Sequence, residues 1–233
     1  MTPTATREPR TAAGAVNRLA AILTSRGIDP RSDAPSTMPE PVTAVQIADA
    51  RIPARYRSAL ADHPAITAWV GEIARAGRPG PAGAPGIGTG PSLLIAGPTG
   101  TGKTHQAYGA IRALLTAAVR LRWEATTAAD LYAAQRPQHG HDAERHLQAL
   151  ARCPLLLLDD LGAAKQSPWT EELTYRLVNH RYNHLLPTLV TTNLPVADLR
   201  EAVGDRVASR LAEMTQRVIL TGRDRRRHTA AEK

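Results

Sequence analysis

Eight consecutive residues near the middle of the chain combine three glycines with a lysine and a threonine at fixed spacing. They are Gly97, Pro98, Thr99, Gly100, Thr101, Gly102, Lys103 and Thr104. The run fits the pattern G-x-x-x-x-G-K-[ST], in which glycines let the backbone curl so that successive N–H groups point at phosphate oxygens. Lys103 is then expected to neutralise the β- and γ-phosphates of a nucleotide, and the Thr104 hydroxyl to bind Mg²⁺. We expect the next residue, His105, to contact the nucleotide as well.

Two acidic residues stand at the end of a later apolar run. Leu155–Leu158 lead directly into Asp159 and Asp160, and four leucines in a row are typical of a buried parallel strand. Ligands of open α/β sheets bind at the carboxyl ends of such strands. Asp159 is therefore expected to hold Mg²⁺, and Asp160 to polarise a water molecule for attack on the γ-phosphate. Two solvated acids at a strand end are the alternative interpretation.

A third apolar run, Thr188–Thr192, ends in a polar amide, Asn193. This amide could orient the attacking water. A turn-forming asparagine before Leu194 and Pro195 would give the same pattern. The residues alone therefore leave both interpretations of Asn193 open.

The elements that must position these residues follow from an alternation of short apolar runs with helical patterns, which predicts a parallel sheet covered by helices. The expected strands are Ser92–Ala96, Arg120–Ala125, Leu155–Asp159, Thr188–Thr192 and Arg217–Leu220. The expected helices are Lys103–Ala118, Ala128–Gln135, Asp142–Arg152, Pro168–Leu185 and Asp205–Glu213. Ser167 is expected to cap the fourth helix, with Pro168 at its first position. The prediction is a three-layer α/β domain with a five-stranded parallel sheet.

Composition divides the chain into three regions. Residues 1–41 hold one predicted helix, Thr11–Arg26, and a Pro-rich linker, and form a candidate partner-binding segment. Residues 42–91 are predicted to form a helical segment that leads into the sheet domain. This segment ends in a Gly/Pro run from Gly77 to Pro91, which is expected to be loop. Residues 92–233 hold the predicted sheet domain.

The chain is strongly basic, with 29 Lys and Arg residues against 21 Asp and Glu residues and a pI near 10.3. This balance suits a partner that carries phosphates or an acidic surface. GC-rich coding, which favours arginine throughout a genome, explains the excess of positive charge equally well. Trp123 and Trp169 could stack on single-stranded bases or pack in the core.

A single cysteine, Cys153, excludes an internal disulfide and a cysteine-based zinc site within one chain. No apolar run approaches the roughly 18 residues that a membrane span needs. Residues 1–10 lack the apolar stretch of a signal peptide. We therefore predict a soluble, cytoplasmic protein without a membrane partner.

Taken in order, these segments resemble the AAA+ P-loop ATPases of the DnaC/DnaI helicase-loader group and the related IstB helper ATPases of transposons. The resemblance extends from Ala50 to Arg227. It rests on Arg51–Tyr56, the P-loop, the run LLLLDDLG, the long helix that leads into LVTTN, Gly204–Leu211 and an Arg-rich strand end.

The resemblance implies contacts for the nucleotide itself. In such ATPases the segment that matches Ile52 and Pro53 lies against the adenine. The asparagine that matches Asn193 is the sensor 1 residue, which responds to the γ-phosphate. ATP and Mg²⁺ are accordingly the expected ligands.

The resemblance also implies roles for arginines near the end of the chain. The arginine that matches Arg210 is a finger that reaches the γ-phosphate of a neighbouring subunit, and Arg206 is the competing candidate. The arginine that matches Arg226 is sensor 2. The few residues after Arg226 leave no room for a full C-terminal helical lid, so none is expected.

The predicted function is that of an AAA+ ATPase in DNA replication. We expect it to bind ATP, to assemble with copies of itself, to bind single-stranded DNA when assembled, and to load a replicative DNA helicase. A helper ATPase that delivers DNA to a transposase is the alternative within the fold. A P-loop kinase and a non-hydrolysing adaptor that uses ATP only as a ligand are alternatives of other classes.

Overall fold

The computed structural model describes residues 50–79, 85–117, 121–136 and 142–222. All of these residues belong to one compact unit, Thr43–Lys233. The helix predicted over Thr11–Arg26, the Pro-rich linker and Arg226 lie outside the described residues.

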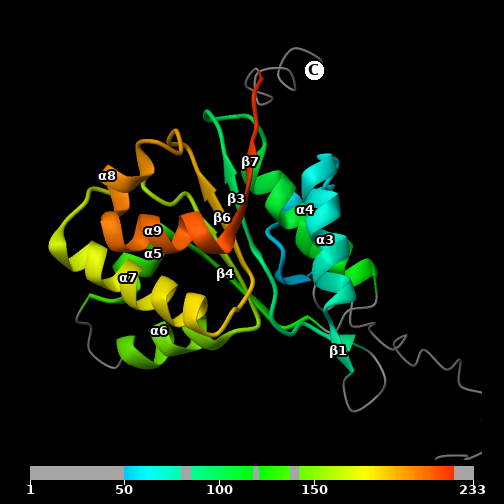
Figure 1. Ribbon diagram of the computed structural model, residues 1–233, viewed down its shortest axis with the longest axis horizontal. Helices are drawn as coiled ribbons and strands as arrows, with labels where there is room; N and C mark the ends of the chain where they lie inside the picture. Colours follow the sequence, from blue (N-terminus) through cyan, green and yellow to red (C-terminus); the bar gives the residue numbers. More distant parts are fainter. Residues whose placement is uncertain (1–49, 80–84, 118–120, 137–141, 223–233) are drawn as a thin grey trace, which may run out of the picture. The chain divides into compact units, whose positions relative to one another are not determined.

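A parallel sheet of five strands forms the centre of this unit (Figure 1). The strands are β3 (Ser92–Ala96), β4 (Trp123–Thr127), β5 (Leu155–Asp159), β6 (Thr188–Thr192) and β7 (Thr215–Ile219). They lie in the order β4-β5-β6-β3-β7, and every neighbouring pair is parallel. The inner strands β3, β5 and β6 are buried almost throughout, as expected for a parallel sheet covered on both faces. The predicted five-stranded parallel sheet is confirmed.

Helices cover both faces of the sheet and give the unit three layers (Figure 1). They are the 3-10 helix η1 (Ala54–Tyr56) and the α-helices α3 (Pro64–Arg75), α4 (Lys103–Thr116), α5 (Ala128–Ala134), α6 (Ala143–Arg152), α7 (Pro168–Asn183), α8 (Leu199–Val203) and α9 (Asp205–Met214). α3 and α4 lie on one face, and α5 to α9 on the other. Along β5, Leu155 and Leu157 pack with the first group, whereas Leu156 and Leu158 pack with the second, because side chains of a strand alternate between faces.

The predicted bounds agree with the structure to within two residues for each of the five expected helices and for every expected strand except β4. β4 begins at Trp123 and continues to Thr127, because its register with β5 pairs Thr127 with Asp159. α7 begins as predicted, with Ser167 in a capping box and Pro168 in the first turn. Among the described helices, none combines enough length and apolar character to cross a membrane.

Two short elements depart from the prediction. The Gly77–Pro91 run is not all loop, since β1 (Arg78–Pro79) and β2 (Pro85–Gly86) form a small antiparallel pair. The fixed φ of proline suits extended backbone, and a two-residue ladder needs few N–H donors. α8, with its buried Leu199 and Val203, is too short to show helical periodicity in the sequence.

The segment between η1 and α3 is tied to α4. Gln106 Oε1 accepts hydrogen bonds from the backbone N of Asp62 and of His63, at 3.2 and 3.4 Å. Gly109 lies so close to the backbone of Leu60 that a Cβ atom at this position would collide with it. The two backbones therefore touch directly, and η1 is held at the end of α4 that carries the P-loop.

Candidate functional site

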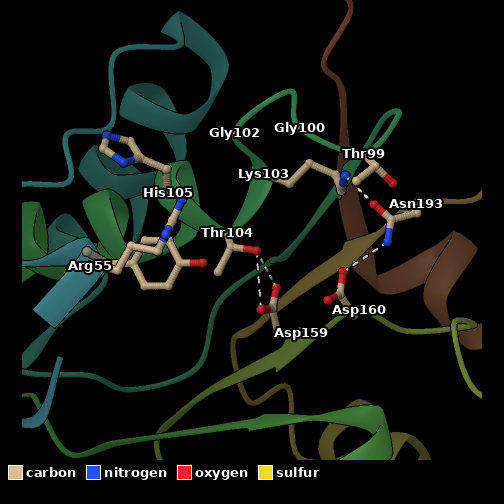
Figure 2. Close-up of a pocket in the computed structure, with 11 residues that line it drawn as sticks. Arg55, Thr99, Gly100, Gly102, Lys103, Thr104, His105, Asp159, Asp160 and Asn193 are labelled. Carbon is tan, nitrogen blue, oxygen red and sulfur yellow. Dashed lines mark hydrogen bonds between the residues drawn. The ribbon is translucent and has the colours of Figure 1, made fainter. Parts of the chain in front are cut away.

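A cavity of about 420 Å³ lies at the carboxyl ends of β5 and β6, beside the first turn of α4 (Figure 2). It is lined by Arg55, Tyr56, Thr99, Gly100, Gly102, Lys103, Thr104, His105, Asp159, Asp160 and Asn193. These residues come from η1, the loop before α4, the end of β5 and the residue after β6. The three motifs predicted from the sequence therefore meet in one place.

The loop between β3 and α4 requires glycine at two positions. Gly102 has a φ of 94° directly before α4, in the left-handed region that favours glycine. Gly97 lies so close to the carbonyl oxygen of Leu220 that a Cβ atom would collide with it. This path brings the N-terminus of α4 to the cavity, where its unpaired N–H groups and partial positive charge suit a phosphate.

The Lys103 ammonium is held within this loop (Figure 2). Its Nζ donates hydrogen bonds to the Pro98 carbonyl at 2.9 Å and to Asn193 Oδ1 at 2.6 Å. Asn193 Nδ2 in turn donates to Asp160 Oδ1 at 3.1 Å. The Thr101 hydroxyl also donates to the Pro98 carbonyl, so Pro98 and Thr101 shape the loop without lining the cavity. A chain of hydrogen bonds thus links the lysine to both strand ends.

The oxygens of Thr104 and Asp159 face each other and fit a magnesium ion. Thr104 Oγ1 lies 3.0 and 3.2 Å from the two carboxylate oxygens of Asp159. Neighbouring ligands of an octahedral Mg²⁺ with bonds of about 2.1 Å lie about 3.0 Å apart. Burial raises the pKa of Asp159 above its ordinary value, although a hydrogen bond from Thr191 lowers it. A half-buried carboxylate that forms no ion pair within the described ranges suits a bound cation.

Asp160 adopts a backbone conformation that is rare for residues other than glycine. Its φ is 53°. Its backbone N donates to the hydroxyl of Thr191 on β6 at 2.9 Å, and the same hydroxyl donates to Asp159 Oδ1. Thr191 therefore positions both acids. Sequence reasoning missed this residue, because a threonine inside an apolar strand carries no signal of its own.

The expected adenine contacts, Ile52 and Pro53, do not line the other end of the cavity. The residues that line it come two or three positions later in the sequence. Ile52 is 1% exposed and packs in the core, and Pro53 does not line the cavity. Arg55 and Tyr56 do line it, and Tyr56 stacks on Tyr108 with ring centroids 4.9 Å apart. Burial raises the pKa of Tyr108 to about 12, so this ring stays a neutral phenol. Both residues belong to the segment Arg51–Tyr56 that supports the family resemblance, but within this segment a nucleotide contact was expected only for Ile52 and Pro53.

The arginines considered as fingers lie outside the cavity of their own chain. Arg210 on α9 is bound to α7, where its Nε donates to Asn179 Oδ1 at 2.8 Å and its guanidinium lies 4.9 Å from the ring centre of Tyr175. Arg206 is an exposed residue, and its guanidinium lies 3.4 Å from the same ring centre. The structure therefore separates an anchored arginine from an exposed one on the same helix.

Comparison with known proteins places this site in a family context. Residues 87–224 match the family described as "IstB-like ATP binding protein", and this span contains the P-loop, Asp159, Asp160 and Asn193. The crystal structure of the DnaC helicase loader is 26% identical, with a TM-score of 0.61, and covers 72% of this chain and 100% of that chain. The AAA+ type of P-loop fold, inferred from the order of the motifs, is confirmed.

Two curated relatives come from different settings. The replicative helicase loader DnaC of Escherichia coli strain K12 is 28% identical over 126 residues, which are 52% of this chain and 49% of that protein. An ATP-binding protein of insertion sequence IS5376 from Geobacillus stearothermophilus is 27% identical over 117 residues, which are 50% and 45% of the two proteins. The chain thus spans about half the length of the curated relatives it matches.

Proposed function

The chain belongs to the family of IstB-like ATP binding proteins, and from this premise we propose that it hydrolyses ATP to ADP and phosphate with Mg²⁺. The observation that carries the proposal is the convergence of the P-loop with Asp159, Asp160 and Asn193 around one cavity. A carboxylate base and a polar amide beside the γ-phosphate are the parts that hydrolysis requires, because the protein mainly positions the reactants and stabilises charge.

In the proposed reaction each residue has one task. Lys103 and the first N–H groups of α4 bind the β- and γ-phosphates, and Thr104 and Asp159 hold Mg²⁺. The bound ion would neutralise charge on the phosphoryl oxygens. Asp160 polarises the attacking water and Asn193 orients it. ATP binding therefore exchanges the hydrogen bond between Lys103 and Asn193 for a contact between Lys103 and phosphate.

Phosphate release from Mg-ATP tests this proposal. Wild-type protein should release phosphate, and Lys103→Ala should bind no nucleotide. Asp160→Asn should bind ATP normally and hydrolyse it about 10²- to 10⁴-fold more slowly. Asparagine adopts left-handed φ values readily, so this variant preserves the backbone at position 160.

The same assay separates the alternatives of other classes. Normal ATP binding with near-zero phosphate release, equal in wild type and Asp160→Asn, would contradict the ATPase and favour the non-hydrolysing adaptor. Transfer of the γ-phosphate to an acceptor instead of water would favour the kinase.

Within the family, the role that we propose is that of a helicase loader in DNA replication, which binds single-stranded DNA when assembled. The similarity to the solved DnaC chain, which is covered over its whole length, supports this role. The insertion-sequence relative supports the alternative of a transposition helper. Binding of the chain with Mg-ATP to immobilised replicative helicase or transposase from the same organism distinguishes the two. Retention by the helicase alone supports the loader, and retention by the transposase alone supports the helper.

Assembly through an arginine finger is a further part of this role, and mixed subunits test it. Asp160→Asn keeps every arginine but lacks the base, whereas Arg210→Ala keeps its own base. If Arg210 acts on a neighbouring site, the mixture should recover part of the activity that neither variant has alone. The same mixture with Arg206→Ala tests the competing candidate. An arginine whose replacement leaves both hydrolysis and ATP-dependent assembly unchanged is excluded as the finger.

A further inference from the structure

A second cavity, of about 370 Å³, lies beside the edge strand β4 and shares no lining residue with the nucleotide cavity. Four arginines line it together with Trp123 and Gln148, namely Arg51, Arg122, Arg145 and Arg152. They come from the segment before η1, the residue before β4, and α6. We call this hollow the arginine cavity. Residues far apart in the sequence gather positive charge around it.

The positive charge of the arginine cavity is largely uncompensated. Among the lining residues that the structure describes, the one acid is Glu124, which pairs with Arg51 at 2.9 Å, and 46% of each side chain is exposed. Within the described ranges, Arg122, Arg145 and Arg152 have no acidic partner. Like charges gathered in this way repel one another, so an anion bound among them would relieve the repulsion.

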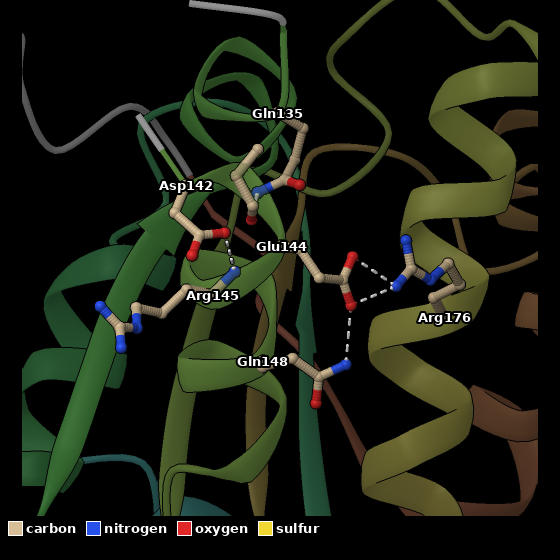
Figure 3. Close-up of polar contacts among 7 residues, drawn as sticks. Gln135, Asp142, Glu144, Arg145, Gln148 and Arg176 are labelled. Carbon is tan, nitrogen blue, oxygen red and sulfur yellow. Dashed lines mark hydrogen bonds and ion pairs between the residues drawn. The ribbon is translucent and has the colours of Figure 1, made fainter. Parts of the chain in front are cut away.

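α6 turns its acidic residue away from the arginine cavity (Figure 3). Glu144 accepts hydrogen bonds from Arg176 on α7, at 2.7 Å to each carboxylate oxygen, and from Gln148 Nε2 at 3.0 Å. The hydrogen bond from Arg176, followed by the one from Gln148, lowers the pKa of Glu144. Arg145 extends from the opposite side of α6 toward β4. The side of α6 that faces α7 is thus neutralised, while the side at the cavity keeps its charge.

Trp123 adds a buried donor that lacks an acceptor. Its side chain is 3% exposed, and its Nε1 has no hydrogen-bond partner in the part of the chain that the structure describes. An unsatisfied buried donor costs about 1–3 kcal/mol. The ring packs edge-on against Tyr108, and the guanidinium of Arg51 lies 5.0 Å from its centre. Trp123 therefore packs in the core instead of offering a face to bases, and it forms part of the wall of the arginine cavity.

We propose that the arginine cavity binds the phosphodiester backbone of a nucleic acid strand. This inference rests on the proposed DNA-binding function and assigns a surface to it. The guanidinium group presents a planar fork of donors that matches phosphate oxygens. The four arginines surround the hollow and are not gathered on one loop, as the phosphate donors of the nucleotide cavity are. Four arginines at separate positions around a cavity can each contact a different phosphate along one strand.

Binding of a fluorescein-labelled oligothymidylate in the presence of Mg-ATP, measured over a salt series, tests the proposal. Each phosphate contact on a single strand contributes about 0.7 to the slope of log K against log salt concentration. The double variant Arg145→Gln/Arg152→Gln should therefore reduce the slope by about 1.4. The matched control, Arg75→Gln/Arg200→Gln, removes the same charge from two exposed side chains on α3 and α8 that do not line the cavity, and it should leave the slope unchanged.

Affinity for Mg-ATP shows whether each variant is folded. If the double variant does not bind Mg-ATP normally, the single variant Arg122→Gln is used in its place, because Arg122 is exposed. This variant should reduce the slope by about 0.7. Wild-type slopes in the cavity variants, or equal losses in cavity and control variants, would overturn the proposal. Absence of phosphate release by the wild type would contradict the ATPase proposal alone, because the salt slope is read independently of turnover.

Discussion

Among the single residues around the nucleotide cavity, Thr191 makes the contacts that organise the two acids. Its hydroxyl donates to Asp159 Oδ1 and accepts from the backbone N of Asp160. The φ of 53° at Asp160 is unfavourable for an aspartate unless surrounding contacts hold it. Thr191 is 0% exposed, so no bulk water is at hand to replace its hydroxyl.

Thr191→Val should slow ATP hydrolysis by about tenfold or more, because Asp160 loses the acceptor that holds its backbone and Asp159 loses a donor. The free energy of unfolding should also fall by about 1–3 kcal/mol, since a buried N–H is left unpaired. Phosphate release and urea denaturation measure the two effects.

Thr192→Val is the matched control. The hydroxyl of Thr192 is also buried, but it bonds to the carbonyl of Leu161 and to the backbone N of Leu194 and not to either acid. It should lose stability to a similar extent and keep most of its activity. Equal losses of activity in the two variants would mean that Thr191 acts only through the stability of β6.

Asn193→Ala decides between the two interpretations of Asn193 that the sequence leaves open. If Asn193 orients the attacking water, kcat should fall about 10- to 100-fold. The Kd for ATP should stay the same or decrease, because Lys103 loses an acceptor that competes with phosphate. A turn-forming asparagine would instead show reduced stability with unchanged kcat, and steady-state kinetics with calorimetry tells these outcomes apart.

The residues that could be predicted from the sequence are those whose type and spacing carry the chemistry. Lys103, Asp159 and Asn193 stand at strand and helix ends, and the parallel sheet brings those ends together. Arg55 and Thr191 could not be predicted in this way. Their positions depend on which segments lie side by side, and an arginine in a lead-in or a threonine in a strand is ordinary in any protein.

At the scale of elements, Arg181 on α7 joins three segments behind the site. It is 1% exposed, and it donates to the carbonyl groups of Leu150, Cys153 and Pro187 at 3.0, 2.8 and 2.7 Å. Its Nε also donates to Thr188 Oγ1 at 2.7 Å. Burial lowers the pKa of Arg181 to about 10. The end of α6 therefore finds partners for its free carbonyl groups on α7, next to the start of β6.

Arg181→Met should lower the free energy of unfolding by about 3 kcal/mol or more, because several buried acceptors each cost about 1–3 kcal/mol when unpaired. Arg176→Met on the same helix is the control. Its exposed ion pair with Glu144 should contribute little, because solvent screens both charges. Urea denaturation of both variants measures the difference, and similar losses would contradict the structural role of Arg181.

The elements themselves were largely predictable, because the apolar runs of β3, β5 and β6 and the capped start of α7 are local patterns. Three features were not. The extent of β4 follows from its pairing with β5, and α8 is too short for periodicity. The pairing of β1 with β2 joins two segments of a Gly/Pro run in which no local pattern predicts a strand.

At the scale of the whole described unit, the walls of the nucleotide cavity come from segments that are separate in the sequence. A ligand that binds all of them should stabilise the unit as a whole. At a Mg-ATP concentration of 100 times Kd, the free energy of unfolding should rise by about 2.7 kcal/mol. Differential scanning calorimetry should show a rise in Tm of several degrees.

Metal removal and a lysine variant are the controls for this shift. EDTA should reduce it, because Thr104 and Asp159 are proposed to act through the ion, and Lys103→Ala should show no shift. A shift of the same size in Lys103→Ala would mean that ATP stabilises the protein at another place.

The contact at Gly109 has a consequence for the segment between η1 and α3. With no side chain between α4 and Leu60, and with Gln106 bonded to the backbone of Asp62 and His63, there is no soft layer to absorb a tilt of that helix. The P-loop leads into the first turn of the same helix. A shift of α4 on nucleotide binding would therefore move residues 60–63 with it. The segment between η1 and α3 would then respond to nucleotide by a displacement and not by a change of charge.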